Sequence, residues 1–400
     1  MPERSYLAYM MASRSMRMNL MRGMLCASFA LTLMVVAHAQ WQLQASNTTA
    51  DLRGIHNVGN GVAWASGTNG AVLRTEDGGY VWQTCAIPPD AEKLDFRGIQ
   101  AFDADTAIVM SSGKGDLSRL YKTTDGCHTW KLLFKNPDKD GFWDAIDIAY
   151  GYPILDPRQA YGWLLGDPVK GQFALFRTND GGKKWWRQEN VGLKAAAESQ
   201  GAFAASNSSF ATLNTGDHII GSGGTAGAKV YRETFRYFCK DSCPPDKHGR
   251  NNRWEVQRTP VGAGSEASGI FAIATTHAKV DQGQTQRVVI AVGGDYTNPD
   301  DAAATAAYSI DNGVHWTAAQ TSPHGYRSSV AYDENLKTWI TVGPNGTDIS
   351  TDDGKNWRAV HPSAALHEAP DADRNWNAIS LPYVVGPKGR IGKLDEPALK

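Results

Sequence analysis

The feature that most constrains the fold of this chain is an eight-residue string that occurs five times. The copies, at residues 75–82, 123–130, 178–185, 309–316 and 350–357, align without gaps on the pattern Ser/Thr-x-Asp-x-Gly-x-x-Trp, and the second has Cys127 at the glycine. The hydroxyl and the carboxylate can accept hydrogen bonds from nearby backbone N–H groups. Glycine supplies the positive φ of a tight turn, and tryptophan packs as an apolar plug beside it. The octet therefore predicts a repeated hairpin turn.

This octet resembles the Asp-box, the repeat of bacterial neuraminidases, where it is a structural device. We therefore expect a structural role, and no catalytic role, for its five aspartates, which are Asp77, Asp125, Asp180, Asp311 and Asp352.

The spacing of the octets is that of propeller blades. Asp77 and Asp125 are 48 residues apart, Asp125 and Asp180 are 55 apart, and Asp311 and Asp352 are 41 apart. A four-stranded blade takes about 40–50 residues. The interval of 131 residues from Asp180 to Asp311 has room for two more blades. Glycine-rich loops recur seven times between predicted strands, at residues 67–70, 112–115, 166–171, 221–224, 293–296, 343–346 and 386–389. The sequence thus predicts an all-β, seven-bladed propeller.

The blades are expected to form a single domain over residues 41–394. Their approximate ranges are 52–86, 96–134, 143–190, 202–258, 267–318, 324–362 and 374–394. The last range has only three predicted strands. We expect residues 41–44 to supply the fourth, because a strand from the N-terminus that pairs with the last blade closes the ring and leaves no open edge.

The first 39 residues have the order of a secretory signal peptide. Arg14, Arg17 and Arg22 precede an apolar run over residues 23–36, and Ala37-His38-Ala39 follows as a cleavage site. The run is too short for a comfortable membrane span of about 20 residues. We therefore expect an exported protein, periplasmic or extracellular, with no membrane span after cleavage.

An exported chain meets an oxidising compartment, where disulfides form. Cys239 and Cys243 are therefore expected to close a local loop. Spacing alone leaves open whether Cys85 pairs with Cys127.

The charge and the motifs exclude several classes of function. The formal net charge is −1, with 40 basic and 41 acidic side chains, which gives no electrostatic reason to expect a nucleic-acid partner. No strand–GxGxxG–helix unit for a dinucleotide is present. A metal site at Cys239 and Cys243 is the rival of the disulfide, but we find no further His or Cys partner for them at ligand spacing. We expect a monomer without cofactor or metal.

Candidate site residues come from the starts of the innermost strands, which a propeller gathers around one mouth of its central channel. These positions are unusually polar, and they hold Arg53, Arg97, Asp144, Arg327 and Asn377. Two further blades share the string Glu-x-x-Gly-x-Phe-Ala, which places Glu198 and Glu266 just before their inner strands. One interpretation is a concave site that binds an anionic group or a peptide carboxylate, with arginine as a forked donor. The other is that these charges pair with one another between blades.

Residues 41–394 resemble the bacterial relatives of the photosystem II assembly and stability factor. The resemblance rests on the strings Trp64-Ala-Ser-Gly-Thr-Asn-Gly70, Tyr121-Lys-Thr-Thr-Asp125 and Arg177-Thr-Asn-Asp-Gly-Gly182. It implies an exported propeller that binds a protein partner through an arginine patch. Arg53, Arg97 and Arg327 are the nearest candidates for that patch.

The alternative is a sialidase-like glycoside hydrolase, because such enzymes also carry Asp-boxes. That chemistry needs an arginine cluster, an acid/base carboxyl group and a tyrosine activated by a glutamate. Glu266 and Tyr326 are the candidates for the last pair, but the Arg-Ile-Pro string of these enzymes is absent at Phe96-Arg97-Gly98-Ile99. We therefore favour a partner-binding protein, with a protein or a small anionic or carbohydrate ligand.

Overall fold

The computed structural model describes residues 40–149, 161–188, 192–214, 217–237, 250–262, 264–276, 279–281, 284–363 and 368–395. The expected signal peptide and the expected Cys239–Cys243 disulfide lie outside the described residues.

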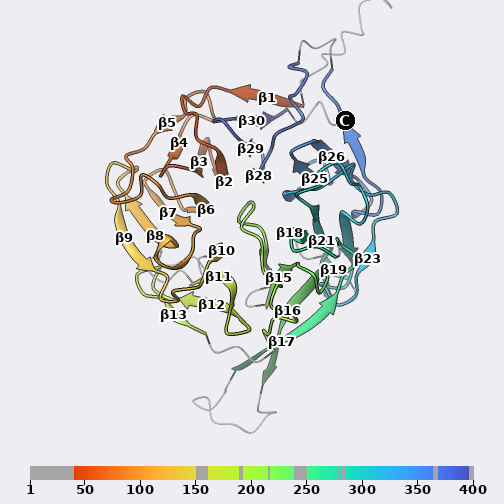
Figure 1. The fold of residues 1–400 in the computed structure, drawn as a ribbon. Helices are drawn as coiled ribbons and strands as arrows, with labels where there is room; N and C mark the ends of the chain where they lie inside the picture. The colour runs from red at the N-terminus through yellow and green to blue at the C-terminus, as the bar shows by residue number, and fades with distance from the viewer. Residues whose placement is uncertain are drawn as a thin grey trace, which may run out of the picture. The chain divides into compact units, whose positions relative to one another are not determined.

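The described chain forms seven four-stranded antiparallel sheets arranged as the blades of a propeller (Figure 1), so the predicted fold class is confirmed. Blade 1 holds β2 (Leu52–Gly59), β3 (Val62–Gly67), β4 (Val72–Thr75) and β5 (Gln83–Thr84). Blade 2 holds β6 (Phe96–Ala101), β7 (Thr106–Ser111), β8 (Arg119–Thr124) and β9 (Lys131–Lys135); blade 3 holds β10 (Trp143–Ala149), β11 (Tyr161–Val169), β12 (Gln172–Thr178) and β13 (Trp186–Arg187). Blade 4 holds β14 (Phe210–Asn214), β15 (Asp217–Ser222), β16 (Lys229–Tyr237) and β17 (Arg250–Arg258).

The remaining blades follow the same order from the centre outward. Blade 5 holds β18 (Ser268–Thr275), β21 (Val289–Asp295), β22 (Ala306–Ser309) and β23 (Thr317–Ala318), with a small hairpin of β19 (Lys279–Asp281) and β20 (Gln284–Gln286) inserted after β18. Blade 6 holds β24 (Ser329–Asp333), β25 (Thr338–Gly343), β26 (Gly346–Ser350) and β27 (Arg358–Val360). Blade 7 holds β28 (Ala378–Ser380), β29 (Tyr383–Val385) and β30 (Ile391–Leu394), and its outer position is taken by β1 (Trp41–Gln44).

Strand β1 lies antiparallel to β30, with Trp41 opposite Leu394 and Gln44 opposite Ile391. The Trp41 side chain is buried, and its Nε1 donates a hydrogen bond to Thr347 Oγ1 of blade 6 at 3.1 Å. Gln44 Oε1 accepts a hydrogen bond from Trp82 Nε1 of blade 1 at 2.9 Å. One short strand thus joins blades 6, 7 and 1.

The hydrophobic core lies between neighbouring blades. The second strand of each blade reads as a near-continuous apolar run because both of its faces are covered, as in Thr106–Ser111, where five of six residues are buried. Each tryptophan of the repeated octets packs in the cluster shared with the preceding blade: Trp130 lies with Trp64 of blade 1, and Trp82 lies with Tyr383 of blade 7. The octet therefore both closes a hairpin and seals an interface.

The five octets form the same turn between the third and fourth strands of their blades. In the copy at residues 178–185, the Thr178 hydroxyl donates to Asp180 Oδ1 at 2.9 Å and accepts from the N–H of Gly182 at 3.1 Å. Asp180 Oδ1 also accepts from the N–H of Lys184 at 3.0 Å. The glycine has φ +84°, in the left-handed region that glycine tolerates best.

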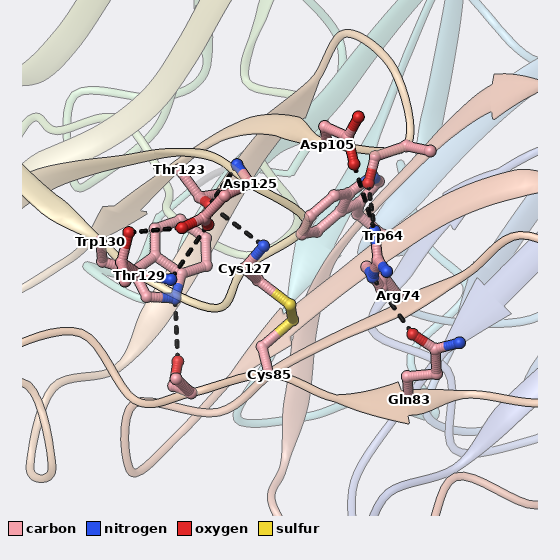
Figure 2. Close-up of a disulfide and its surroundings, with 12 residues drawn as sticks. Trp64, Arg74, Gln83, Cys85, Asp105, Thr123, Asp125, Cys127, Thr129 and Trp130 are labelled. Carbon is pink, nitrogen blue, oxygen red and sulfur yellow. Dashed lines mark hydrogen bonds and ion pairs between the residues drawn. A yellow bond between two sulfur atoms is a disulfide. The ribbon is translucent and has the colours of Figure 1, made fainter.

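The imperfect octet is held by a disulfide between blades 1 and 2 (Figure 2). Cys127, at the glycine position, has φ +64° and bonds to Cys85, just after β5. Trp130 Nε1 donates to the carbonyl of Ala86 at 2.8 Å beside this bond. In the same turn, hydrogen bonds from the hydroxyl and the N–H of Thr129 lower the pKa of Asp125 to about 2. The pairing that spacing left open is thus settled.

The direction of the strands separates two faces of the propeller. The glycine-rich loops join the second and third strands and lie beside the starts of the innermost strands, as Gly67 does opposite Leu52. The octets lie at the opposite ends of the third strands. We call the first of these the glycine-loop face.

Candidate binding face

A β-bulge marks the start of the innermost strand in blades 1, 2, 3 and 5. The register shifts by one residue between Leu52 and Gly54, Phe96 and Gly98, Trp143 and Ala145, and Ile270 and Ala272. The extra residues are Arg53, Arg97, Asp144 and Phe271. A bulge leaves its extra residue out of the ladder and re-aims the side chain. Two of these side chains, Arg53 and Arg97, are partly exposed at the glycine-loop face, whereas Asp144 and Phe271 are buried.

Arg53 and Arg97 share one carboxylate. Arg97 Nε donates to Asp95 Oδ2 at 2.8 Å, and Arg53 Nε lies 3.4 Å from Asp95 Oδ1. The two arginine side chains are 30% and 28% exposed. Because two guanidinium groups face one carboxylate, this arginine pair keeps an excess positive charge at the surface.

Asp144 and Asp167 lie side by side on the neighbouring strands β10 and β11. Burial and then the charge of Asp167 raise the pKa of Asp144 well above its usual range, although the nearby Arg97 opposes this shift. Burial also raises the pKa of Asp167 to about 6, against the lowering effect of the hydrogen bond from the N–H of Ala202. The shifted pKa values favour the neutral form of Asp144, so it offsets little of the charge of the arginine pair.

The segment 202–209, which precedes β14, crosses the space between the innermost strands; we call it the plug (Figure 1). Arg97 Nη1 donates to the carbonyl of Ala204 at 3.3 Å. The Asn207 side chain accepts from the N–H of Ile146 at 2.8 Å and donates to its carbonyl at 3.0 Å. Ser206 Oγ donates to the carbonyl of Ser328, and the carbonyl of Ser208 accepts from the N–H of Ile273, both at 2.7 Å.

These hydrogen bonds tie the plug to blades 2, 3, 5 and 6. The close approach also explains a glycine, because a Cβ at Gly98 would lie 2.7 Å from Asn207 Oδ1. The plug therefore forms the floor beneath the bulged residues.

An aromatic cluster lies next to the plug. Phe203 stacks on Phe271 with ring centroids 3.9 Å apart, and Tyr326 and Tyr296 meet Phe271 edge-on at 4.7 and 6.0 Å. Tyr296 is exposed, whereas Tyr326 is buried. The string Glu-x-x-Gly-x-Phe-Ala thus has a structural meaning, since its two copies bring their phenylalanine rings face to face.

A cavity of about 780 Å³ opens beside this cluster. It is lined by Asp167, Glu198, Glu266 and Phe203, together with small residues of the segments 197–202 and Thr225. Both glutamates are exposed. The structure therefore brings Glu198 and Glu266 together at one cavity, with Asp167 as a third carboxyl group; we call it the acidic cavity.

Arg327, expected among the binding arginines, lies inside blade 6 and is fully buried. Its Nε donates to Asp348 Oδ2 at 2.8 Å, and its Nη1 donates to the carbonyl of Tyr326 at 2.8 Å. The register of β24 with β25 shows no bulge, and Asp348 on β26 supplies a buried counter-charge. The expectation that Arg327 faces a ligand is therefore wrong, because the regular strand turns this side chain into the blade.

Two other candidates also face inward: Asn377 has an internal partner, and Tyr326 is buried. Asn377 Nδ2 donates to the carbonyl of Leu52 at 2.8 Å and so joins blade 7 to blade 1. Burial raises the pKa of the Tyr326 hydroxyl, which opposes formation of the phenolate that a nucleophile would need. No observation therefore assigns Tyr326 a role in a hydrolase.

Reasoning from the sequence overlooked Phe271 and the plug. Phe271 could have been found, because Ile270-Phe271-Ala272-Ile273 repeats the apolar-x-small-Ile pattern of Phe96-Arg97-Gly98-Ile99. The plug, by contrast, has the sequence of a polar loop, and no sequence pattern indicated that the first strand of blade 4 begins at Phe210.

Within the described ranges, no helix is long and apolar enough to cross a membrane. No group of three or more His, Cys, Asp or Glu in that part of the chain is arranged to hold a metal ion.

Neither the comparison with protein-family models nor that with curated proteins found a match. Among solved structures, the chain is similar to YCF48 bound to D1 peptide, with a TM-score of 0.56, 16% identity and coverage of 91% of this chain and 99% of that one. It is also similar to YCF48 from Cyanidioschyzon merolae, with a TM-score of 0.54, 17% identity and coverage of 90% and 99%. At these identities the likeness bears on the fold. The predicted resemblance is confirmed at that level: the chain is a seven-bladed β-propeller with the fold of the photosystem II assembly factor YCF48.

Proposed function

We propose that this protein is an exported, non-enzymatic binding protein that holds a segment of a protein partner on its glycine-loop face. A carboxylate of that segment lies on the arginine pair, Arg53 and Arg97. Export rests on the signal-like residues 1–39 of the sequence.

The observation that carries the proposal is the pair of guanidinium groups on the single carboxylate of Asp95. Each arginine is about one-third exposed, so an incoming carboxylate can reach it. Charge-assisted hydrogen bonds from arginine to a carboxylate are roughly twice as strong as neutral ones. The exposed ring of Tyr296 offers apolar contact nearby, as aromatic residues do in many interfaces. The peptide bound to a YCF48 of the same fold supports a peptide as the class of ligand.

The test compares pools of short synthetic peptides with free and with amidated C-termini. Peptides retained by the immobilised protein are identified by mass spectrometry, and their affinities are measured by fluorescence anisotropy. We expect the free-acid forms to bind more tightly. The double variant Arg53→Gln/Arg97→Gln should lose that preference, since an interface arginine can contribute 2 kcal/mol or more, on the order of a 30-fold change in affinity.

The matched control is Arg358→Gln, an exposed arginine on the outer strand β27. It should bind like the unchanged protein. Equal binding of free-acid and amidated peptides, or an undiminished affinity in the double variant, would contradict the proposal.

A further inference from the structure

We propose that the acidic cavity between blades 3, 4 and 5 binds a primary ammonium or guanidinium group, carried by a basic residue of the same partner segment. The placement of that segment rests on the proposed function, but the cation site itself can be tested alone.

The lining of the cavity carries charge of one sign. Asp167, Glu198 and Glu266 contribute three carboxyl groups, and none of the described lining residues is Lys or Arg. Carboxylates without a basic partner repel one another, and a cation relieves that repulsion. The arginine pair nearby has the opposite imbalance. The glycine-loop face is therefore dipolar, and it complements a ligand that carries both a carboxylate and a basic group.

A second observation is a buried carboxyl group in the layer behind Asp167. Asp144 is 1% exposed, and its Oδ2 has no hydrogen-bond partner among the described residues. Buried polar atoms are normally satisfied, and an exception calls for an explanation. Asp144 is the bulged residue of β10, opposite the turn from Gly166 into Asp167. The charge of Asp167 contributes to the raised pKa of Asp144, so a cation bound beside Asp167 would lower the cost of ionising Asp144.

The size and the walls of the cavity favour an organic cation. About 780 Å³ exceeds the needs of a single metal ion, and the carboxyl groups do not form a metal-binding cluster in the described part of the chain. Phe203 supplies an aromatic wall, which stacking on Phe271 holds in place. An aromatic ring beside an ammonium or guanidinium group attracts it through the cation–π interaction.

The titration of Asp167 gives the site a pH dependence. The groups that face it are Asp144 on β10, Glu198 and Glu266 across the cavity, and Arg97 behind Asp144. The pKa of Asp167 is about 6 in the free protein. A bound cation favours the ionised carboxylate, so binding should weaken as the pH falls through about 6.

The experiment uses Nα-acetyl-lysine amide as the probe and Nα-acetyl-norleucine amide as its uncharged control, with saturation-transfer NMR to detect weak binding. We expect only the lysine probe to bind. Its affinity should fall on the order of tenfold in Glu198→Gln/Glu266→Gln, about 1.4 kcal/mol. The control is Glu334→Gln. Glu334 lies in the β24–β25 turn on the opposite face, so its substitution should leave binding unchanged. Lysine-probe binding should also decrease with added salt.

Failure to bind the lysine probe, equal binding of both probes, or full binding by the cavity variant would each overturn the proposal. The two hypotheses fail separately. If Arg53→Gln/Arg97→Gln keeps the lysine probe and also keeps every free-acid peptide, the acidic cavity stands and the proposed function falls. If the arginine variant loses the peptides while Glu198→Gln/Glu266→Gln still binds the lysine probe, the proposed function is supported and the cation site in the acidic cavity is refuted.

Discussion

At the scale of single residues, backbone register decides whether an arginine faces solvent or its own blade. Arg97 is the extra residue of a bulge and remains about one-third exposed beside Asp95. Arg327 precedes a strand of regular register and lies buried on Asp348. Although burial alone would raise it, hydrogen bonding from His324 and the charge of Arg327 hold the pKa of Asp348 below its usual value. Arg327 thus belongs to the architecture of blade 6.

The buried ion pair gives a first prediction. Arg327→Gln leaves the Asp348 carboxylate buried without its counter-charge, and losing one partner of a buried pair costs about 3–5 kcal/mol. Urea denaturation should show this loss, whereas Arg53→Gln, at a partly exposed pair, should change the free energy of unfolding by no more than about 1 kcal/mol. Similar effects of the two substitutions would refute the internal role of Arg327. Adding Asp348→Asn to Arg327→Gln should recover part of the loss.

Asp167 gives a second prediction, on pH. Its pKa is about 6 in the folded protein, above the ordinary 3.8, so the fold binds this proton more tightly than the unfolded chain does. Its contribution to stability is therefore present at low pH and is lost as the pH rises through about 6. Asp167→Asn should unfold at higher urea than the unchanged protein at pH above about 6, and at similar urea below pH about 4. The opposite order at neutral pH would show that Asp167 is ionised at little cost.

Sequence reasoning reached residues whose role is local and missed those whose role depends on the closed ring. The aspartates of the octets bond within eight residues, so their turn could be predicted from the pattern alone. Asn207 bonds Ile146, 61 residues away, and Ser206 bonds Ser328, 122 residues away. Nothing near these residues in the chain indicates such partners. The acidic cavity combines Asp167, Glu198 and Glu266 for the same reason.

At the scale of elements, the octet turn and the disulfide are two ways to fix the same connection. Four copies have glycine where the left-handed backbone is needed, and the copy at residues 123–130 has Cys127 in that conformation, anchored to Cys85. A side chain at positive φ is costly unless its surroundings compensate. The covalent bond supplies that compensation at the interface of blades 1 and 2.

The third prediction concerns the octet at residues 178–185. Asp180→Ala removes the acceptor for the N–H of Lys184 and the hydroxyl of Thr178, and should lower the free energy of unfolding by about 1–3 kcal/mol. Asp180→Asn keeps a side-chain oxygen and should lose less. Because the octets lie opposite the glycine-loop face, peptide affinity should stay the same in both variants. A large loss of affinity at normal stability would contradict this orientation.

The fourth prediction concerns the disulfide, which closes a sequence separation of 42 residues. The chain-entropy relation gives about 4 kcal/mol for a loop of this length. Cys85→Ser/Cys127→Ser should lose much of this stability in thermal unfolding. Cys85→Ser/Cys127→Gly should be more stable than the double serine variant by about 1 kcal/mol, because glycine tolerates the positive φ. If the serine variant is the more stable of the two, the conformation of residue 127 has no such cost.

At the scale of the whole molecule, stability is distributed over the interfaces between blades. Each described core cluster combines residues of two neighbouring blades, as Trp143 and Phe176 of blade 3 do with Ile108 of blade 2. In the described residues, therefore, no single blade has a hydrophobic core of its own. The interface of blades 6 and 7 depends on β1, because Trp41 packs there with Trp376 and Ile340.

The fifth prediction follows from that interface. A chain that begins at Ser46 lacks β1 and exposes the edge of β30, so its melting temperature should fall well below that of a chain that begins at Gln40. Trp41→Ala in the longer chain should cost about 3–5 kcal/mol, the usual cost of removing a buried large aromatic side chain. Equal melting temperatures for the two chain lengths would show that β1 contributes nothing to closure.

The plug connects the blades at the centre of the ring, and this connection affects how a partner could bind. Its hydrogen bonds reach blades 2, 3, 5 and 6, and the bond to blade 2 runs from Arg97 to the carbonyl of Ala204. A partner that passed through the central channel would have to break several of these hydrogen bonds at once, whereas a partner on the glycine-loop face would break none. These hydrogen bonds hold the glycine-loop face in one arrangement, and for the proposed binding such an arrangement would lower the entropy lost on association. Under the proposed function, a chain end or a loop would therefore bind from one side and could leave without being pulled through the ring.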